Sequence, residues 1–197
     1  HQSGASASIA LGEGPLAPEK VSFIDCMSGV VSISRSGFFE LGAMQPLLTG
    51  EGRNIWGGID FGYRAHQHGF SFWRVRNAIA FHHDDALASL EARCRRNYRV
   101  SLAVHHLFAR YPALKGQIPM FHDKGPIEWR QDSPRLIARK LARQVASSGP
   151  AVATMNRLVD ALEQHRPTSQ MLHLLHRWII SASIYKGYRH GLEEPGT

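Results

Sequence analysis

Apolar residues in the second half of the chain recur at the spacing of amphipathic helices. Leu87, Leu90, Cys94 and Tyr98 form one such stripe, and Pro112 ends the pattern. Helices are expected over 86–111, 134–146, 151–164 and 169–188, with a Gly- and Pro-bearing loop at 113–133. The region after residue 85 is therefore predicted to be mostly helical.

The first half of the chain mixes two hydrophobic periods. Residues 1–19 are small and polar and are expected to form a flexible lead-in. Strands are expected at 30–34, 70–75 and 78–81, helical segments at 35–41 (closed by Gly42) and 59–68 (closed by Gly69), and a loop at 43–54. This order indicates an α/β unit at 20–85, followed by a helical region at 86–197.

Composition adds a strong positive charge to this picture. The 197 residues are 43% hydrophobic and carry a formal net charge of +7. A basic chain attracts anions, so nucleotide phosphates, nucleic acid and acidic lipid headgroups are all candidates. The basic residues accompany no known nucleic-acid-binding motif, which argues against a dedicated nucleic-acid binder.

Two further features restrict the class of protein. Cys26 and Cys94 lie far apart and form no CxxC or CxxH spacing, so the sequence suggests neither a disulfide framework nor a structural zinc site. No apolar run reaches about 18 residues, so a cytoplasmic location is expected, with peripheral membrane contact as a further option.

The segment 134–146 is basic and amphipathic. Its basic residues Arg135, Arg139, Lys140 and Arg143 oppose the apolar residues Leu136, Ile137, Leu141 and Val145. Such a helix can lie on an anionic membrane surface, or it can pack through its apolar side and leave its basic side in solvent. The second arrangement is the expected one.

Candidate chemistry gathers between residues 54 and 85. Asp60 follows a Trp56-Gly57-Gly58 turn at the start of a predicted helix. The helix dipole stabilises an ionised carboxylate there, so Asp60 is a candidate general base. The alternative is that Asp60 only caps the helix.

His82, His83, Asp84 and Asp85 form a second cluster at the end of a predicted strand. Side chains alternate along a strand, so His82 and Asp84 share one side and suit Mn, Zn or Mg with further ligands. An ordinary strand end, with the aspartates capping the next helix, explains the same residues. Nearby, Arg95, Arg96 and Arg99 form a solvated helix face or meet phosphate.

These motifs come in a recognisable order. The succession IDCMSGVVSISRSGFFELG and WGGIDFGYRAHQHGFSFWRVRNAIAFHHD resembles the C-terminal half of a family 2 glycosyltransferase with the GT-A fold, over residues 20 to 85. The matching positions are Gly29 with Arg35, Phe39 with Gly42, Asp60 with Arg64, Gly69, and His82.

The resemblance implies a sugar transferase, inverting, that uses a nucleotide-sugar donor, a hydroxyl acceptor and a divalent cation, Mn or Mg. It implies that Asp60 is the catalytic base and His82 the metal ligand, with Trp56, Gly57, Gly58 and Arg64 near the substrate. The family usually has Glu-Asp where this chain has Gly57 and Gly58. Counted back from Arg64, the catalytic acid falls on Gly58 and Asp60 becomes a second, structural acid.

The expected fold is thus α/β: the C-terminal half of a GT-A (nucleotide-diphospho-sugar transferase) fold, followed by a mostly α-helical extension. No DxD metal motif occurs in these 197 residues, so the donor-binding N-terminal half is expected from another polypeptide or a longer chain. The helical tail is a candidate for homo-oligomer contacts.

Two rival functions remain open. One is a non-catalytic module that retains the half-fold and binds a partner in an assembly. The other is a metal-dependent hydrolase built on His82, His83 and Asp84, which lacks a second ligand cluster.

Overall fold

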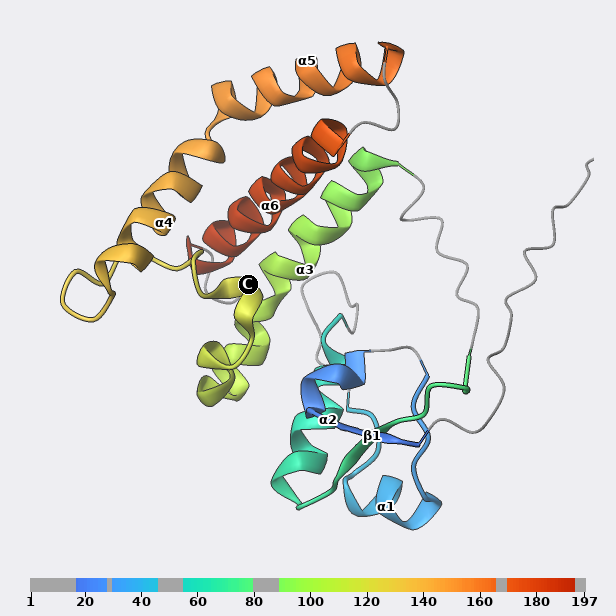
Figure 1. The fold of residues 1–197 in the computed structure, drawn as a ribbon. Helices are drawn as coiled ribbons and strands as arrows, with labels where there is room; N and C mark the ends of the chain where they lie inside the picture. Colours follow the sequence, from blue (N-terminus) through green and yellow to red (C-terminus); the bar gives the residue numbers. More distant parts are fainter. Residues whose placement is uncertain (1–16, 28–29, 46–54, 80–88, 166–169, 194–197) are drawn as a thin grey trace, which may run out of the picture.

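The computed structural model describes residues 17–27, 30–45, 55–79, 89–165 and 170–193. These residues are 68% helical and contain a two-stranded sheet. The elements are β1 (Glu19–Val21), η1 (Phe23–Met27), α1 (Arg35–Glu40), α2 (Gly57–Gln67), β2 (Phe72–Arg74), α3 (Leu90–Arg110), η3 (Pro112–Gly116), η4 (Pro119–Phe121), α4 (Pro134–Ala146), α5 (Gly149–His165) and α6 (Gln170–Glu193) (Figure 1).

The predicted α/β half-fold of the GT-A type is wrong. Within the described residues, the sheet consists of β1 and β2 paired antiparallel, with Lys20 opposite Trp73. Each strand is three residues long. A pair this small cannot provide the layered sheet that an α/β core requires.

The strand predictions failed for identifiable reasons. Residues 30–34 carry β-branched side chains, yet Val30 and Val31 are exposed and Ser34 instead caps α1 by accepting a hydrogen bond from the Gly37 amide. Short-range alternation does not supply a pairing partner, and a strand needs one. Ala78 and Ile79 are not in a strand either, while 80 and 81 lie outside the described residues.

Of the flexible lead-in predicted at 1–19, the structure describes only residues 17–19. Glu19 begins β1, where Arg74 lies opposite it and both Arg74 and Arg76 pair with its carboxylate. Nothing local in the sequence signals this strand, because its register depends on a partner more than 50 residues away.

The helix predictions are confirmed with small shifts at the ends. Helix α4 has the predicted bounds, because Ser133 accepts a hydrogen bond from the Leu136 amide and Pro134 occupies the first turn. Helix α3 begins at Leu90, where Ser89 is the N-cap, rather than at 86. Two glycines also act as predicted: Gly42 follows α1 at φ 74° and Gly69 follows α2 at φ 81°.

The long helices α3 and α6 lie side by side (Figure 1). Glycines on α6 allow this approach: a Cβ at Gly187 would lie 2.2 Å from the Tyr98 carbonyl oxygen, and one at Gly191 would lie 2.7 Å from that of Leu102. Gly191 is therefore an interhelical contact, and α6 runs five residues beyond the predicted end at 188.

One hydrophobic core crosses the expected boundary at residue 85. Trp56 and Ile59 from the first part pack with Val104, Leu107 and further residues of the second part. Helix α2 therefore packs against the C-terminal half of α3, and the beginning of α2 is held by helical residues far along the chain.

Candidate functional site

Trp56, at the start of α2, packs against α3. Its side chain is only 2% exposed, and its indole Nε1 donates to the Val100 carbonyl at 2.9 Å. The ring also contacts Phe121. Of the two glycines that follow, Gly57 is buried and Gly58 is partly exposed. Trp56 is thus part of the core, and of these three residues Gly58 is the one that solvent reaches most.

Asp60 is fully buried in the fourth position of α2, with 0% exposure. One carboxylate oxygen, Oδ2, accepts from Arg64 Nε and Nη2, both at 3.0 Å. The other, Oδ1, accepts from the Tyr111 hydroxyl at 3.0 Å and lies 3.3 Å from Arg110 Nη1. Both oxygens are therefore engaged by groups of α2 and by the end of α3.

Arg64 extends this network to a third segment. Its guanidinium also donates to the carbonyl oxygens of Leu41 and Ala43, the latter at 2.8 Å, and lies over the Phe61 ring. The side chain is 11% exposed. The hydrogen bonds of Arg64 thus connect the turn after α1 to α2.

Burial and the Asp60 hydrogen bond raise the pKa of the Tyr111 phenol. The phenol therefore keeps its proton and remains a donor to the carboxylate. This hydrogen bond and the ion pair with Arg64 together hold the Asp60 side chain in its place inside the core.

This arrangement determines what Asp60 and Arg64 can do chemically. A general base needs access to a substrate proton within about 2.6–3.2 Å. Asp60 is buried and already accepts from Arg64 and Tyr111, so an acceptor hydroxyl would have to displace one of them. The geometry suits the alternative in which Asp60 is the structural acid. Arg64 also has a structural position, because its guanidinium already bonds to Asp60 and to the carbonyl oxygens of Leu41 and Ala43.

His82 lies outside the described residues, together with His83, Asp84 and Asp85. The metal role of His82 therefore stays a prediction. In the part of the chain that the structure describes, no three His, Cys, Asp or Glu side chains form a group that could hold a metal ion.

Three of the described histidines make contacts that hold the fold together. His66 stacks on Phe23, with ring centroids 5.1 Å apart, and His68 Nδ1 lies 2.8 Å from the Arg64 carbonyl oxygen. His105 Nε2 lies 2.8 Å from the Tyr188 carbonyl oxygen on α6. On the arginine face of α3, Arg95 pairs with Glu91 and is exposed, as expected of a solvated face.

The sequence missed a second buried charge cluster, around Asp123. Lys124 and Arg143 donate to its carboxylate, each at 2.9 Å, and Arg139 lies 3.3 Å away. Burial favours a higher pKa for Asp123, but the hydrogen bonds from Lys124 and Arg143 outweigh it and hold the pKa well below the ordinary value. The residues 123–124 lie in what the sequence predicts only as loop, so no periodic signal marks them.

Lys140 of α4 connects this helix to the loop before it. Its Nζ donates to Asp132 at 2.6 Å and to the Pro126 carbonyl at 2.8 Å, and the side chain is 7% exposed. Arg143 also donates to Ser181 of α6 at 2.5 Å. Lys140 and Arg143 thus face the protein, against the expectation of a solvated basic side, while Arg135 and Arg139 remain exposed as expected.

Comparisons of the chain with protein-family models, with curated proteins and with solved structures gave no match. Among the described helices, none is long and apolar enough to cross a membrane.

Proposed function

We propose that this chain is part of a glycosyltransferase that moves a sugar from a nucleotide-sugar donor to an acceptor hydroxyl, with the donor-binding part supplied by other sequence. The ordered motifs from Gly29 to His82 carry the proposal. The structural observation in its favour is the pairing of Asp60 with Arg64 one helical turn later. The proposal does not depend on a GT-A half-fold.

Within this proposal, Asp60 is a positioning residue. Its ion pairs hold the beginning of α2 against α3 and the turn after α1. Gly58 then occupies the place of the family's catalytic acid, so the base comes from another group. His82 would hold the divalent cation, which would supply positive charge for the diphosphate of the donor.

The test is a calorimetric titration of the chain with Mn²⁺ alone, because the proposal places the donor-binding part in other sequence. His82→Ala is expected to weaken Mn²⁺ binding at least about tenfold, since loss of one ligand removes a direct metal bond. His165→Ala is the matched control, because His165 is exposed and its Nδ1 lies 2.9 Å from the Ala161 carbonyl oxygen of its own helix. Equal Mn²⁺ affinity in the two variants would contradict the proposal.

A non-catalytic module that binds a partner is the second candidate. The specific observation in its favour is the full engagement of Asp60 combined with glycine at position 58. A module of this kind needs no divalent cation, so the unaltered chain and His82→Ala would have the same affinity for Mn²⁺. Saturable Mn²⁺ binding that His82→Ala weakens would exclude it.

A further inference from the structure

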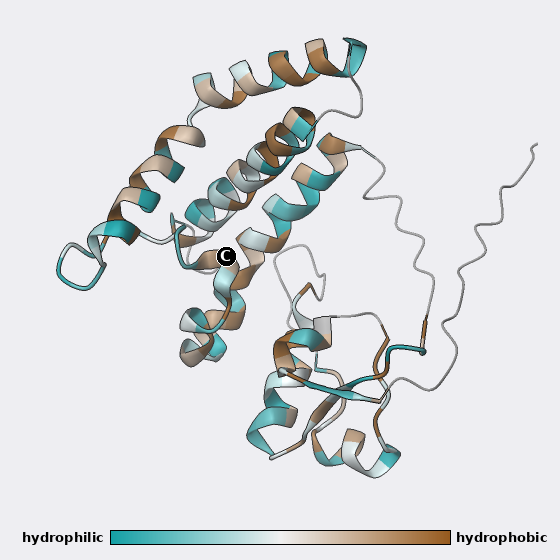
Figure 2. Ribbon diagram, in the orientation of Figure 1, coloured by the Kyte–Doolittle hydropathy of each residue, from teal (hydrophilic) through white to brown (hydrophobic). Residues whose placement is uncertain are grey.

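Helix α4 presents part of its apolar side to solvent. Val145 is 70% exposed and Leu141 is 44% exposed. Ala138 and Ala142 are exposed beside them, and Ile137 is partly buried. These five positions fall on one side of the helix, and we call them the α4 apolar stripe. Figure 2 shows hydrophobic and hydrophilic residues alternating along this helix.

The opposite side of α4 is fixed to the protein by charge. Lys140 is buried against Asp132, and Arg143 bonds to Asp123 and Ser181. These contacts determine how the helix is rotated about its axis. The α4 apolar stripe therefore cannot turn inward without breaking buried ion pairs, which is costly.

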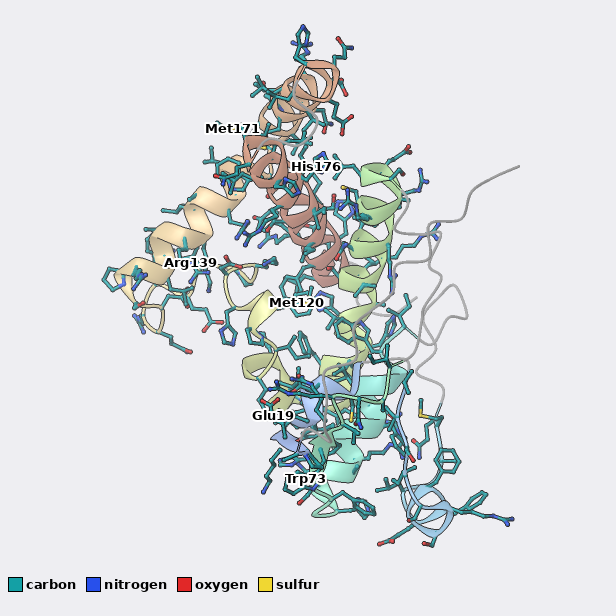
Figure 3. The ribbon with its side chains drawn as sticks, turned by 45° about the vertical axis from the view of Figure 1, so that its right-hand side comes forward. Glu19, Trp73, Met120, Arg139, Met171 and His176 are labelled. Carbon is teal, nitrogen blue, oxygen red and sulfur yellow. The ribbon has the colours of Figure 1, made fainter. Side chains whose placement is uncertain are left out.

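Basic residues border the α4 apolar stripe. Arg135 is exposed, and the side chain of Arg139, labelled in Figure 3, is 61% exposed while it lies 3.3 Å from Asp123. Residues 134–193 contain nine Arg and Lys against three Asp and Glu, a net charge of +6 out of the chain's +7. Residues 134–193 thus carry most of the chain's net positive charge.

We infer that the α4 apolar stripe docks on an anionic lipid surface. An interfacial helix buries aliphatic side chains at the boundary of headgroups and acyl chains, while flanking arginines reach anionic headgroups. A second copy of the chain is a poorer occupant, because a two-fold contact through the stripe brings two sets of Arg135 and Arg139 together. This inference is independent of the proposed function.

The experiment is sedimentation of the chain with vesicles, either of phosphatidylcholine alone or of equal parts phosphatidylcholine and phosphatidylglycerol. The chain is expected to bind the mixed vesicles at low salt and to be released as the salt concentration rises. The double variant Leu141→Glu with Val145→Glu is expected to lower the partition coefficient at least about tenfold.

A matched control uses Val75→Glu with Ile79→Glu. These residues are 47% and 51% exposed and follow β2, which lies apart from α4 in Figures 1 and 3. The control adds the same two negative charges to two exposed aliphatic positions. Its binding should stay within about twofold of that of the unaltered chain, because a net charge effect alone is weaker than loss of the stripe. Circular dichroism of both variants verifies that the helices remain folded.

Three results would overturn the inference. The first is no binding to mixed vesicles, and the second is an equal loss of binding in both double variants. The third is sedimentation equilibrium showing a dimer that Leu141→Glu with Val145→Glu abolishes, in the absence of vesicle binding. That outcome would assign the α4 apolar stripe to a second copy of the chain.

Discussion

At the scale of single residues, the buried pair of Asp60 and Arg64 is the most consequential feature. Asp60→Asn should destabilise the chain by about 3 kcal/mol, because it leaves the Arg64 charge without its partner inside the protein. Urea unfolding measures the loss. Glu91→Gln is the control: Glu91 pairs with Arg95 at the surface and is 78% exposed, so its loss should stay below about 1 kcal/mol. Equal effects would contradict a structural role for Asp60.

His105 gives a second prediction at this scale, concerning pH. Burial lowers its pKa below 6.5, although the hydrogen bond to the Tyr188 carbonyl opposes the shift. The unfolded chain then takes up the proton at a higher pH than the folded chain, so stability falls as the pH drops through about 6.5. Urea midpoints at pH 7.5 and 5.5 measure this loss, which should be smaller in His105→Gln. An unchanged pH dependence in that variant would exclude His105 as its source.

The sequence predicted the residue types of the candidate site but could not predict their surroundings. Asp60 and Arg64 were recognisable from their order in the motif. Their burial depends on Tyr111 and Arg110, which are about 50 residues away and have no local signature. Whether a carboxylate acts as a base or as a structural charge depends on such distant donors, so periodicity alone left both interpretations open.

At the scale of elements, the contact between α3 and α6 depends on glycine. In Gly187→Ala the new Cβ would lie 2.2 Å from the Tyr98 carbonyl oxygen, so the helices must separate. We expect a loss of about 2 kcal/mol or more, as for other overpacked contacts. Gly149→Ala is the control, since a Cβ there meets nothing within 4 Å. A thermal unfolding temperature in Gly187→Ala as high as in the control would contradict this packing.

Element prediction succeeded where the determinants were local and failed where they were not. Helix α4 was predicted to the residue because Ser133 and Pro134 mark its beginning. The burial of Lys140 and Arg143 on α4 was not predicted, because hydrophobic periodicity cannot anticipate that Asp132 and Asp123 hold these two side chains inward. The strand expected at 30–34 failed for the same reason, since a strand depends on its partner.

At the scale of the whole molecule, the shared core predicts that the two predicted regions unfold together. Trp56 lies in this core at the contact of α2 with α3, whereas the helical signal of the chain comes mostly from α3 to α6. In a variant with Trp73, Trp129 and Trp178 replaced by phenylalanine, tryptophan fluorescence comes from Trp56 alone. All three are more than half exposed, so their replacement should cost little stability.

Unfolding of that variant in urea should give the same midpoint by Trp56 fluorescence and by circular dichroism at 222 nm, as expected of one cooperative unit. Val104 and Leu107 are 0% exposed and pack against α2, so removal of the first part would expose both. Helices α3 to α6 therefore depend on the segment that carries Asp60. Two separated midpoints would instead mean that residues 20–85 and 86–197 fold independently, as the change of hydrophobic period near residue 85 first suggested.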